Sequence, residues 1–337
     1  GEAELVNEST VKVNEAELRA DKIVLAVGSE PLFLPFTAKG KHVISTTEVL
    51  DLEEIPQSIV MIGGGVSSVE LASVFAMLGS KVTIIEREAA LLSTQDREIT
   101  AELKKALEKK GCSILTETTV KSCRDNNEGT GAMTVYASSD GNERTLRTDK
   151  TLVAIGRTLN PHFVEALKKI GVKLAGNRVE VNEFMQTSLP SVYVIGDAAF
   201  KNLTAYGGER EGECAASHIL GTPRPVRYED IPVTVFSHPE VGAIGITEKE
   251  ARVQGISYQV KKSSYGSNAK ALIMNAREGM VKIIIDQKTQ QVLGVHCVGA
   301  PRPQRDHGRS FSARLDVLDE VERFALHEAQ PLLLAAR

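Results

Sequence analysis

The chain has 337 residues and a mass of 36.4 kDa, and its 40 basic and 44 acidic side chains leave a formal charge of −4. At roughly 100–200 residues per domain, this length predicts about two or three domains. The nearly even charge balance argues against a nucleic-acid-binding protein, which normally carries a basic stripe. Apolar residues make up 42% of the chain, close to the globular average, so the sequence is not disordered as a whole.

The sequence predicts neither a membrane span nor a signal peptide. The most apolar stretch, residues 59–78, contains three consecutive glycines and Glu70. The first ten residues have no basic region followed by an apolar one. The four cysteines are scattered without a CxxC or other close pair, so neither a disulfide framework nor a metal site is predicted. We therefore expect a reducing, cytoplasmic location.

The first half of the chain alternates strands with helices. Strand-like sequence fills residues 1–30, and residues 59–86 read as a strand, a glycine turn, a helix and a second strand. A further helix is predicted over residues 96–110, where one face carries the apolar residues Ile99, Leu103, Ala106 and Leu107. Short strands follow up to residue 156. This alternation is typical of an α/β domain with a mainly parallel sheet.

The second half changes character. A strand ends at Gly196-Asp197, helix-compatible sequence follows, and a proline-bearing linker covers residues 222–230. Between residues 232 and 299, strands and turns alternate as in an antiparallel sheet, which predicts an α+β domain. From about residue 301 the sequence is rich in arginine and proline and loses its apolar periodicity. We attribute this to a linker or to an altered reading frame over roughly Pro301 to Ser312.

The strongest local motif is the glycine turn Gly63-Gly64-Gly65, which directly follows a strand and opens a helix. Such a turn lets a pyrophosphate approach the backbone, and the helix N-terminus offers it free N–H groups. Ser68 replaces the third glycine of the pattern. Glu86 ends the next strand, 23 residues after Gly63, where a carboxylate can bind a ribose 2′-hydroxyl and repel a 2′-phosphate. The motif therefore predicts binding of NAD over NADP, the alternative being a glycine turn without a ligand.

Three other glycines each follow an apolar strand. Gly28 and Gly156 belong to AVGSEP and AIGRTLNP, and taken singly each is an ordinary strand-to-loop turn. Asp197 follows Gly196 at the end of VYVIGD, so its carboxylate is predicted at the ligand-binding edge of an open sheet. An N-cap for the next helix is its alternative role, and the two are compatible.

Taken in order, these motifs, together with SHPEVGAIGITEKEA and EGMVKIIIDQKTQQVLGVHCVG, resemble the pyridine nucleotide–disulfide oxidoreductases, and within that family most closely the dihydrolipoamide dehydrogenases. The resemblance covers residues 1 to about 300. It implies Rossmann-like FAD- and NAD-binding domains followed by a dimerisation domain, in a homodimer that passes hydride from a dithiol such as a lipoyl group through FAD to NAD. The implied division is a remnant of the FAD-binding domain in 1–35, the NAD-binding domain in 36–155, the second part of the FAD-binding domain in 156–224, and the dimerisation domain in 225–337.

The resemblance also implies roles for single residues. Around the NAD pyrophosphate it places the residues of the glycine turn and the following helix, Gly63, Gly64, Gly65 and Ser68. Glu86 would bind the adenosine ribose, and Glu70 would lie near the nicotinamide and the flavin. Gly28 and Gly156 would lie beside the nucleotide cofactors, and Asp197 would bind the ribityl chain of FAD.

The sequence departs from the family at both ends. It contains no CxxxxC redox pair and no glycine fingerprint for the ADP part of FAD, and Cys112 is expected to fill core. It also has no His-Pro pair followed by Glu near the C-terminus, since His307 and His327 lack that context. No catalytic residue is therefore assigned, and we expect a truncated, inactive member. Alternatives are a mercuric reductase-like or soluble transhydrogenase-like member, or a non-catalytic NAD-binding or dimerisation module.

Overall fold

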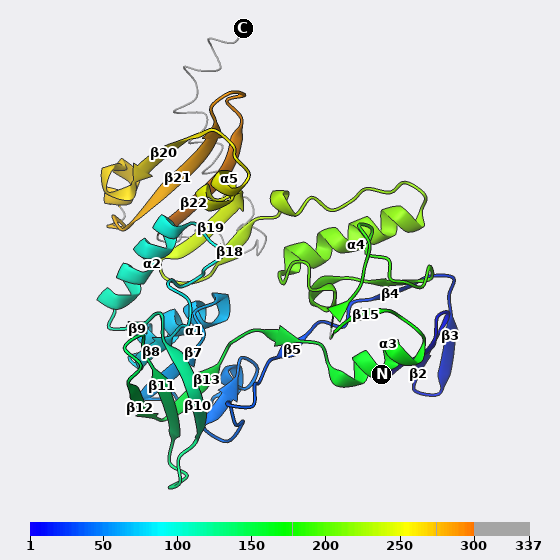
Figure 1. The fold of residues 1–337 in the computed structure, drawn as a ribbon, viewed down its shortest axis with the longest axis horizontal. Coiled ribbons are helices and arrows are strands. Elements are labelled where there is room, and N and C mark those ends of the chain that lie inside the picture. The colour runs from blue at the N-terminus through cyan, green and yellow to red at the C-terminus, as the bar shows by residue number, and fades with distance from the viewer. Residues whose placement is uncertain (177, 274, 300–337) are drawn as a thin grey trace. The chain divides into compact units, whose positions relative to one another are not determined.

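The computed structural model describes residues 1–176, 178–273 and 275–299. The chain forms two compact units (Figure 1). Unit 1 combines residues 1–32 with 156–231, and unit 2 combines residues 33–155 with the chain from residue 232. Unit 1 is thus discontinuous, because the central segment is inserted between residues 32 and 156. The four-part domain division implied by the sequence stays a prediction.

Unit 1 is built from short strands and two main helices. An antiparallel sheet contains β1 (Ala3–Asn7), β2 (Thr10–Val13) and β3 (Ala16–Arg19). The other strands form three pairs. β4 (Ile23–Leu25) lies parallel to β17 (Val192–Val194). β5 (Glu30–Pro31) pairs with β14 (Arg157–Thr158), and β15 (Leu174–Ala175) with β16 (Arg178–Val179), both antiparallel. The helices are α3 (Pro161–Lys169), α4 (Ala205–Ile219) and the short 3-10 helices η2 (Gly196–Ala199) and η3 (Tyr228–Asp230).

Helix α3 was not expected from the sequence, although its start has a clear physical cause. Asn160 accepts hydrogen bonds from the N–H groups of His162 and Phe163, at 2.8 and 3.3 Å. Pro161 occupies the first helical position, where its missing N–H costs nothing. The buried side chains of Val164 and Leu167 then join the core of unit 1.

The central part of unit 2 confirms the predicted parallel α/β fold. Its five strands follow the order β6 (Val43–Ser45), β13 (Lys150–Val153), β7 (Ser58–Ile62), β8 (Lys81–Ile85) and β9 (Ser113–Leu115), and all neighbours are parallel. Helix α1 (Val66–Met77) follows β7, and α2 (Arg97–Lys109) follows β8. The four apolar residues predicted for one face of α2 are all buried, namely Ile99, Leu103, Ala106 and Leu107.

The sequence analysis did not predict that this part contains a second sheet. It is antiparallel and contains β10 (Thr119–Asp125), β11 (Ala132–Ala137) and β12 (Glu143–Thr148). In β11, buried and half-buried residues alternate strictly, as expected for a sheet with one face toward the core. The 3-10 helix η1 (Glu48–Asp51) precedes β7.

The C-terminal part of unit 2 confirms the predicted antiparallel sheet. Its strand order is β18 (Val233–Val235), β19 (Glu240–Gly245), β22 (Val292–Gly299), β21 (Gly279–Asp286) and β20 (Tyr258–Ser264). Its short helices are α5 (Glu248–Val253), η4 (Tyr265–Ser267) and α6 (Ala269–Ile273). His296 is buried in β22, and its Nε2 donates to the carbonyl oxygen of Ile246 at 3.0 Å.

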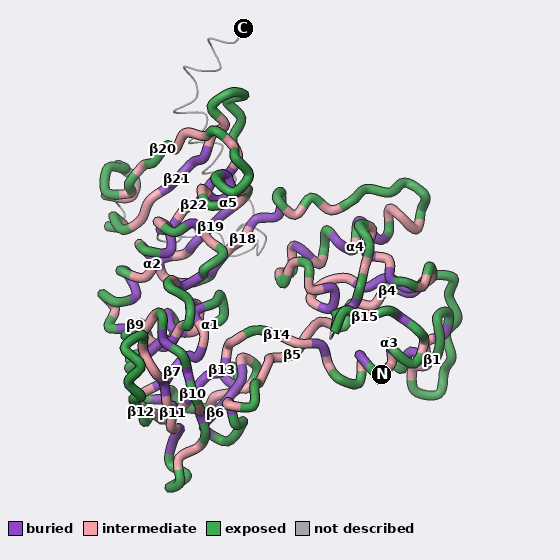
Figure 2. The backbone as a smooth tube through the Cα atoms, viewed as in Figure 1, coloured by how far each residue is buried: buried purple, intermediate pink, exposed green. Residues whose placement is uncertain are grey.

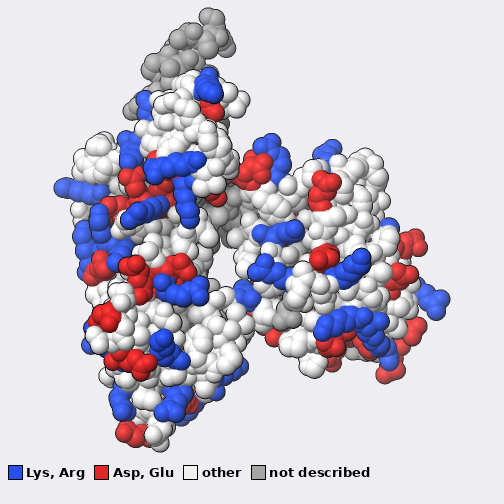
Figure 3. Space-filling view, in the orientation of Figure 1, with Lys and Arg blue, Asp and Glu red and all other residues white. Residues whose placement is uncertain are grey.

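One apolar core joins the two parts of unit 2. It contains residues of α1, α2 and the parallel sheet, and it includes Val235, Val241 and Val298 of the C-terminal sheet. Figure 2 shows that buried residues concentrate on strands and on helix faces, whereas most loops are exposed. On the face drawn in Figure 3, acidic and basic side chains are interspersed. Among the described residues, no helix has the length and apolar character needed to cross a membrane.

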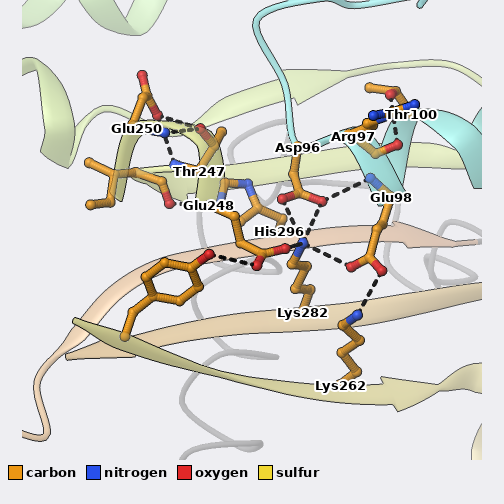
Figure 4. Close-up of polar contacts among 12 residues, drawn as sticks. Asp96, Arg97, Glu98, Thr100, Thr247, Glu248, Glu250, Lys262, Lys282 and His296 are labelled. Atoms are coloured by element: carbon orange, nitrogen blue, oxygen red, sulfur yellow. Dashed lines mark hydrogen bonds and ion pairs between the residues drawn. The ribbon is translucent and has the colours of Figure 1, made fainter. Parts of the chain in front are cut away.

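A buried ion cluster also joins these two parts (Figure 4). The side chain of Lys282, on β21, is 1% exposed, and its Nζ lies 2.8 Å from Oδ2 of Asp96, the N-cap of α2, and 2.8 Å from Oε2 of Glu98. Lys282 also forms an ion pair with Glu248 of α5. Burial disfavours the ammonium, but its hydrogen bonds to these carboxylates outweigh that effect and raise the pKa of Lys282.

We expect Lys282→Met to lower the free energy of unfolding by about 3–5 kcal/mol, because it leaves the buried Asp96 carboxylate without its charged partner. Lys262→Met is the matched control, since Lys262 pairs with Glu98 at 2.6 Å but both side chains are more than two-fifths exposed. That change should cost about 1 kcal/mol or less. Urea unfolding measures both, and equal losses in the two variants would show that burial of the cluster contributes nothing.

Candidate functional site

The glycine turn lies at the carboxyl edge of the parallel sheet, between β7 and α1. Gly63 has a φ of +100°, and a Cβ atom there would lie 2.5 Å from the carbonyl oxygen of Ala154, just after β13. Its N–H donates to the carbonyl oxygen of Ile85 at 2.9 Å. Only glycine combines a positive φ with the absence of a Cβ atom at this position. The turn is therefore fixed by close contact with the two neighbouring strands.

Gly65 differs from Gly63 because its surroundings are open. A Cβ atom there would meet no heavy atom of the described residues within 4 Å. Gly65 is the N-cap of α1, no side-chain cap is found within the part of the chain that the structure describes, and the first turn contains no acidic residue. The first N–H groups of α1 are therefore available to an anion, which is the arrangement that binds pyrophosphates at helix N-termini.

The Glu86 carboxylate lies against this turn. Its Oε2 accepts a hydrogen bond from the N–H of Gly64, and its Oε1 accepts one from the N–H of Glu88 at 2.7 Å. A Cβ atom on Gly64 would lie 2.9 Å from Glu86 Oε2, so the missing side chain permits this approach. The structure thus brings together the glycine turn and the acid that the sequence pairs with it, while their role toward a dinucleotide stays a prediction.

Ser68 lies in the first turns of α1 but away from the open side. Its side chain is fully buried, and its Oγ has no hydrogen-bond partner among the described residues. A small residue at this place lets the helix pack closely on the strand, which is the physical role of the third glycine in the pattern. The buried hydroxyl of Ser68 therefore belongs to the packing of α1 on the sheet, while a role of Ser68 toward the pyrophosphate stays a prediction.

Glu70 links α1 to the loop that follows β18. Its Oε1 accepts a hydrogen bond from the N–H of Phe236 at 2.8 Å, and nearby the Ser73 hydroxyl accepts one from the N–H of His238, also at 2.8 Å. Burial raises the pKa of the Glu70 carboxyl, and the hydrogen bond from Phe236 offsets this only in part. A place near the nicotinamide and the flavin stays a prediction for Glu70.

In unit 1, three strand-end motifs meet at Asp197. Its Oδ2 accepts a hydrogen bond from the Ser29 hydroxyl at 2.7 Å and lies 3.3 Å from Nε of Arg157. Arg157 also donates from Nη2 to the carbonyl oxygen of Ser29 at 2.6 Å. Gly28 and Gly156 immediately precede these two residues, and both have positive φ and open space where a Cβ would lie. Sequence reasoning missed Ser29 and Arg157, although each directly follows a glycine that it had singled out.

Glu211 is a further residue that the sequence did not single out. Its side chain is fully buried in α4, where it accepts hydrogen bonds from the N–H of Gly196 at 2.7 Å and from the Tyr228 hydroxyl at 2.9 Å. Burial raises the pKa of the Glu211 carboxyl, and these hydrogen bonds offset it in part. This carboxylate fixes the turn that presents Asp197.

Comparison with known proteins adds an independent line of evidence. Residues 1–217 match the family model described as pyridine nucleotide-disulphide oxidoreductase, and residues 231–308 match that of its dimerisation domain. The chain belongs to the pyridine nucleotide-disulphide oxidoreductase family. The predicted family is thereby confirmed, as is the fold class of Rossmann-like domains with a dimerisation domain.

Curated relatives agree with this membership. A dihydrolipoyl dehydrogenase of Geobacillus stearothermophilus is 33% identical over 304 residues, which cover 89% of this chain and 64% of the relative. A leghemoglobin reductase of Glycine max is 31% identical, with 95% of this chain and 62% of the relative covered. The chain therefore spans less than two thirds of the length of these relatives.

A solved structure supports the fold. The HOCl-induced flavoprotein disulfide reductase RclA from Escherichia coli has a TM-score of 0.78 and 26% sequence identity, and the match covers 89% of this chain and 68% of that chain. The cofactors that the sequence predicts, FAD and NAD(H), are those of the family, whose members are oxidoreductases.

The cysteines form no redox pair. No disulfide joins any two of the four cysteines, all of which lie in the described residues, and Cys112, Cys123 and Cys214 are buried, which places Cys112 in the core as predicted. Burial raises the pKa of the Cys112 and Cys214 thiols and raises that of Cys123 to about 12. These thiols are therefore poor nucleophiles at neutral pH. His307, His327 and the stretch from Pro301 to Ser312 lie outside the described residues.

Gly63→Ala should lower the free energy of unfolding by at least about 1–3 kcal/mol, because it combines backbone strain at positive φ with a clash against Ala154. Gly65→Ala is its matched control. With a φ of −77° and open surroundings, it should cost about 1 kcal/mol or less. Denaturant unfolding of the two variants decides this, and a Gly63→Ala chain as stable as the control would contradict the close contact.

The raised pKa of Glu70 predicts a pH dependence. Between the ordinary and the raised pKa, the folded chain binds more protons than the unfolded chain, so the free energy of unfolding falls as pH rises through that window. Glu70→Gln removes this titration. We expect the free energy of unfolding of the variant, relative to the parent, to increase as the pH rises above about 4, the ordinary pKa of a glutamate.

Urea unfolding at a series of pH values measures this difference. Glu54→Gln, at an exposed loop position, is the matched control. A constant difference between Glu70→Gln and the parent over the whole range would mean that folding does not alter proton binding at Glu70.

Proposed function

We propose that the chain binds NAD(H) at the glycine turn and Glu86, within an FAD-dependent oxidoreductase acting on a dithiol or disulfide. The observation that supports this best is the open N-terminus of α1 beside a carboxylate held by two backbone N–H groups. The space at Gly65 fits a pyrophosphate, and the remaining lone pairs of Glu86 can accept from a ribose hydroxyl. A 2′-phosphate would face the negative charge of Glu86, so the site favours NAD.

The residues around Asp197 fit the polyhydroxyl chain of a flavin. Asp197 offers a carboxylate acceptor, Ser29 and Arg157 hold it in place, and Gly28 and Gly156 leave space beside it. A bound flavin supplies hydride and electron transfer between a nicotinamide and a sulfur substrate. Glu211 keeps the turn at Gly196 in position for this contact.

The relatives support one substrate class over others. Several are dihydrolipoyl dehydrogenases, which favours a lipoyl dithiol; another family member, such as a mercuric reductase-like or soluble transhydrogenase-like enzyme, is the alternative. The match to the dimerisation domain over residues 231–308 supports a homodimer formed through the C-terminal sheet. Four cysteines without a disulfide between them agree with a cytoplasmic location.

A second candidate is a non-catalytic NAD-binding or dimerisation module. It is favoured by the cysteines, since the sequence contains no closely spaced pair and the buried thiols have raised pKa values. A disulfide exchange step needs a thiolate that can attack a sulfur atom. We therefore propose that these 337 residues alone do not turn over a dithiol.

Calorimetric titration with NADH and NADPH tests the proposed site. We expect the parent chain to prefer NADH and Glu86→Gln to lose roughly tenfold in NADH affinity, since a hydrogen bond to a charged group contributes about 1.5–3 kcal/mol. Glu102→Gln is the control and should bind as the parent does, since Glu102 is a half-exposed residue of α2 that pairs only with Lys105 among the ion pairs of the described residues. A folded parent chain without NADH affinity refutes the proposal. NADH binding without lipoamide reduction in the presence of FAD identifies the module, whereas turnover identifies the enzyme.

A further inference from the structure

The chain just after β8 holds three charged residues in a row, Glu86, Arg87 and Glu88. Glu86 is engaged by backbone N–H groups on both oxygens, one of them from Glu88. Arg87 instead points its guanidinium at the Glu88 side chain, with Nε and Nη2 at 3.3 and 3.1 Å from Oε1. The backbone N–H of Glu88 therefore binds Glu86, and the carboxylate of Glu88 binds Arg87. Both contacts lie at the proposed sugar-binding end of the candidate site.

Arg87 is the residue that an NADP site would use. A guanidinium close to the end of the second strand is the group that accommodates a 2′-phosphate, because its planar fork binds phosphate oxygens in pairs. In this chain its side chain is 78% exposed and so has room to move, but its charge is already paired with the Glu88 carboxylate, whose side chain is 51% exposed.

We propose that Glu88 is a positioning residue for cofactor selectivity, which withholds Arg87 from a 2′-phosphate and so acts with Glu86 to exclude NADP(H). This inference rests on the proposed NAD(H) site. A 2′-phosphate near Glu86 is repelled by the Glu86 carboxylate. The guanidinium of Arg87, which would otherwise bind the phosphate, is paired with the Glu88 carboxylate. Because Glu88 competes with the 2′-phosphate for Arg87, the pair discriminates against NADP(H) as the wrong ligand.

Glu88→Gln tests the pairing, because it removes the charge and retains both the size of the side chain and the backbone N–H to Glu86. An exposed ion pair contributes at most about 1 kcal/mol, and 1.4 kcal/mol corresponds to a factor of ten. We therefore expect the ratio of the NADPH to the NADH dissociation constant to fall about threefold to fivefold. Titration calorimetry of the full chain measures both constants.

Two further variants separate this mechanism from a general disturbance of the loop. In Arg87→Gln/Glu88→Gln the gain should disappear, because the guanidinium that binds the phosphate is gone. Glu88→Asp restores a carboxylate and should restore the parent ratio. The effect should also vanish at about 1 M salt, where the screening length is about 3 Å, whereas a change in loop structure would persist.

The outcomes are distinguishable. If the folded parent chain fails to bind NADH, the proposed function falls and this inference falls with it. If the parent binds NADH but Glu88→Gln leaves the ratio unchanged, only the inference is overturned. The same holds if the double variant keeps the gain, because the effect would then not pass through Arg87.

Discussion

The contact between Gly63 and the carbonyl oxygen of Ala154 is the constraint on which the candidate site depends. It brings the turn so close to the neighbouring strand that no side chain fits, at a φ of +100°. Because the turn is fixed there, α1 begins at the carboxyl edge of the parallel sheet, where open α/β sheets bind their ligands. The same position lets the N–H of Gly64 reach the Glu86 carboxylate at the end of the next strand. One steric condition thus sets both ends of the proposed NAD(H) site.

The remainder of unit 2 supports this edge through α1 and α2. Glu70 and Ser73 accept hydrogen bonds from the loop after β18, and the N-cap of α2, Asp96, binds the buried ammonium of Lys282. Apolar residues of the C-terminal sheet also enter the core around the parallel sheet. The helix that opens at the glycine turn is therefore held at several points by a part of the chain that lies more than 160 residues further along.

Elements with a periodic apolar pattern could be predicted from the sequence, and so could the pairing of the glycine turn with Glu86, since both depend on local spacing. The ion cluster could not, because Asp96 and Lys282 are 186 residues apart and, in the sequence, neither can be told from an ordinary surface charge. Helix α3 was not predicted for a different reason, because it is short and its start depends on the side chain of Asn160. The motif predicts that Ser68 takes the place of the third glycine. The direction of its hydroxyl could not be predicted, because it depends on how α1 packs on the sheet.

The two candidate cofactor sites differ in what they offer a ligand. At α1 the described residues supply no side-chain cap and Gly65 leaves open space among them, so a pyrophosphate adds its hydrogen bonds without displacing any of these residues. At Asp197 the carboxylate already accepts from Ser29 and lies against Arg157, so a hydroxyl must share an acceptor that the protein itself uses. A carboxylate has about four lone-pair sites and can do so, but the gain in free energy is smaller than at an unpartnered group. On these grounds the dinucleotide site in unit 2 is the better preorganised of the two.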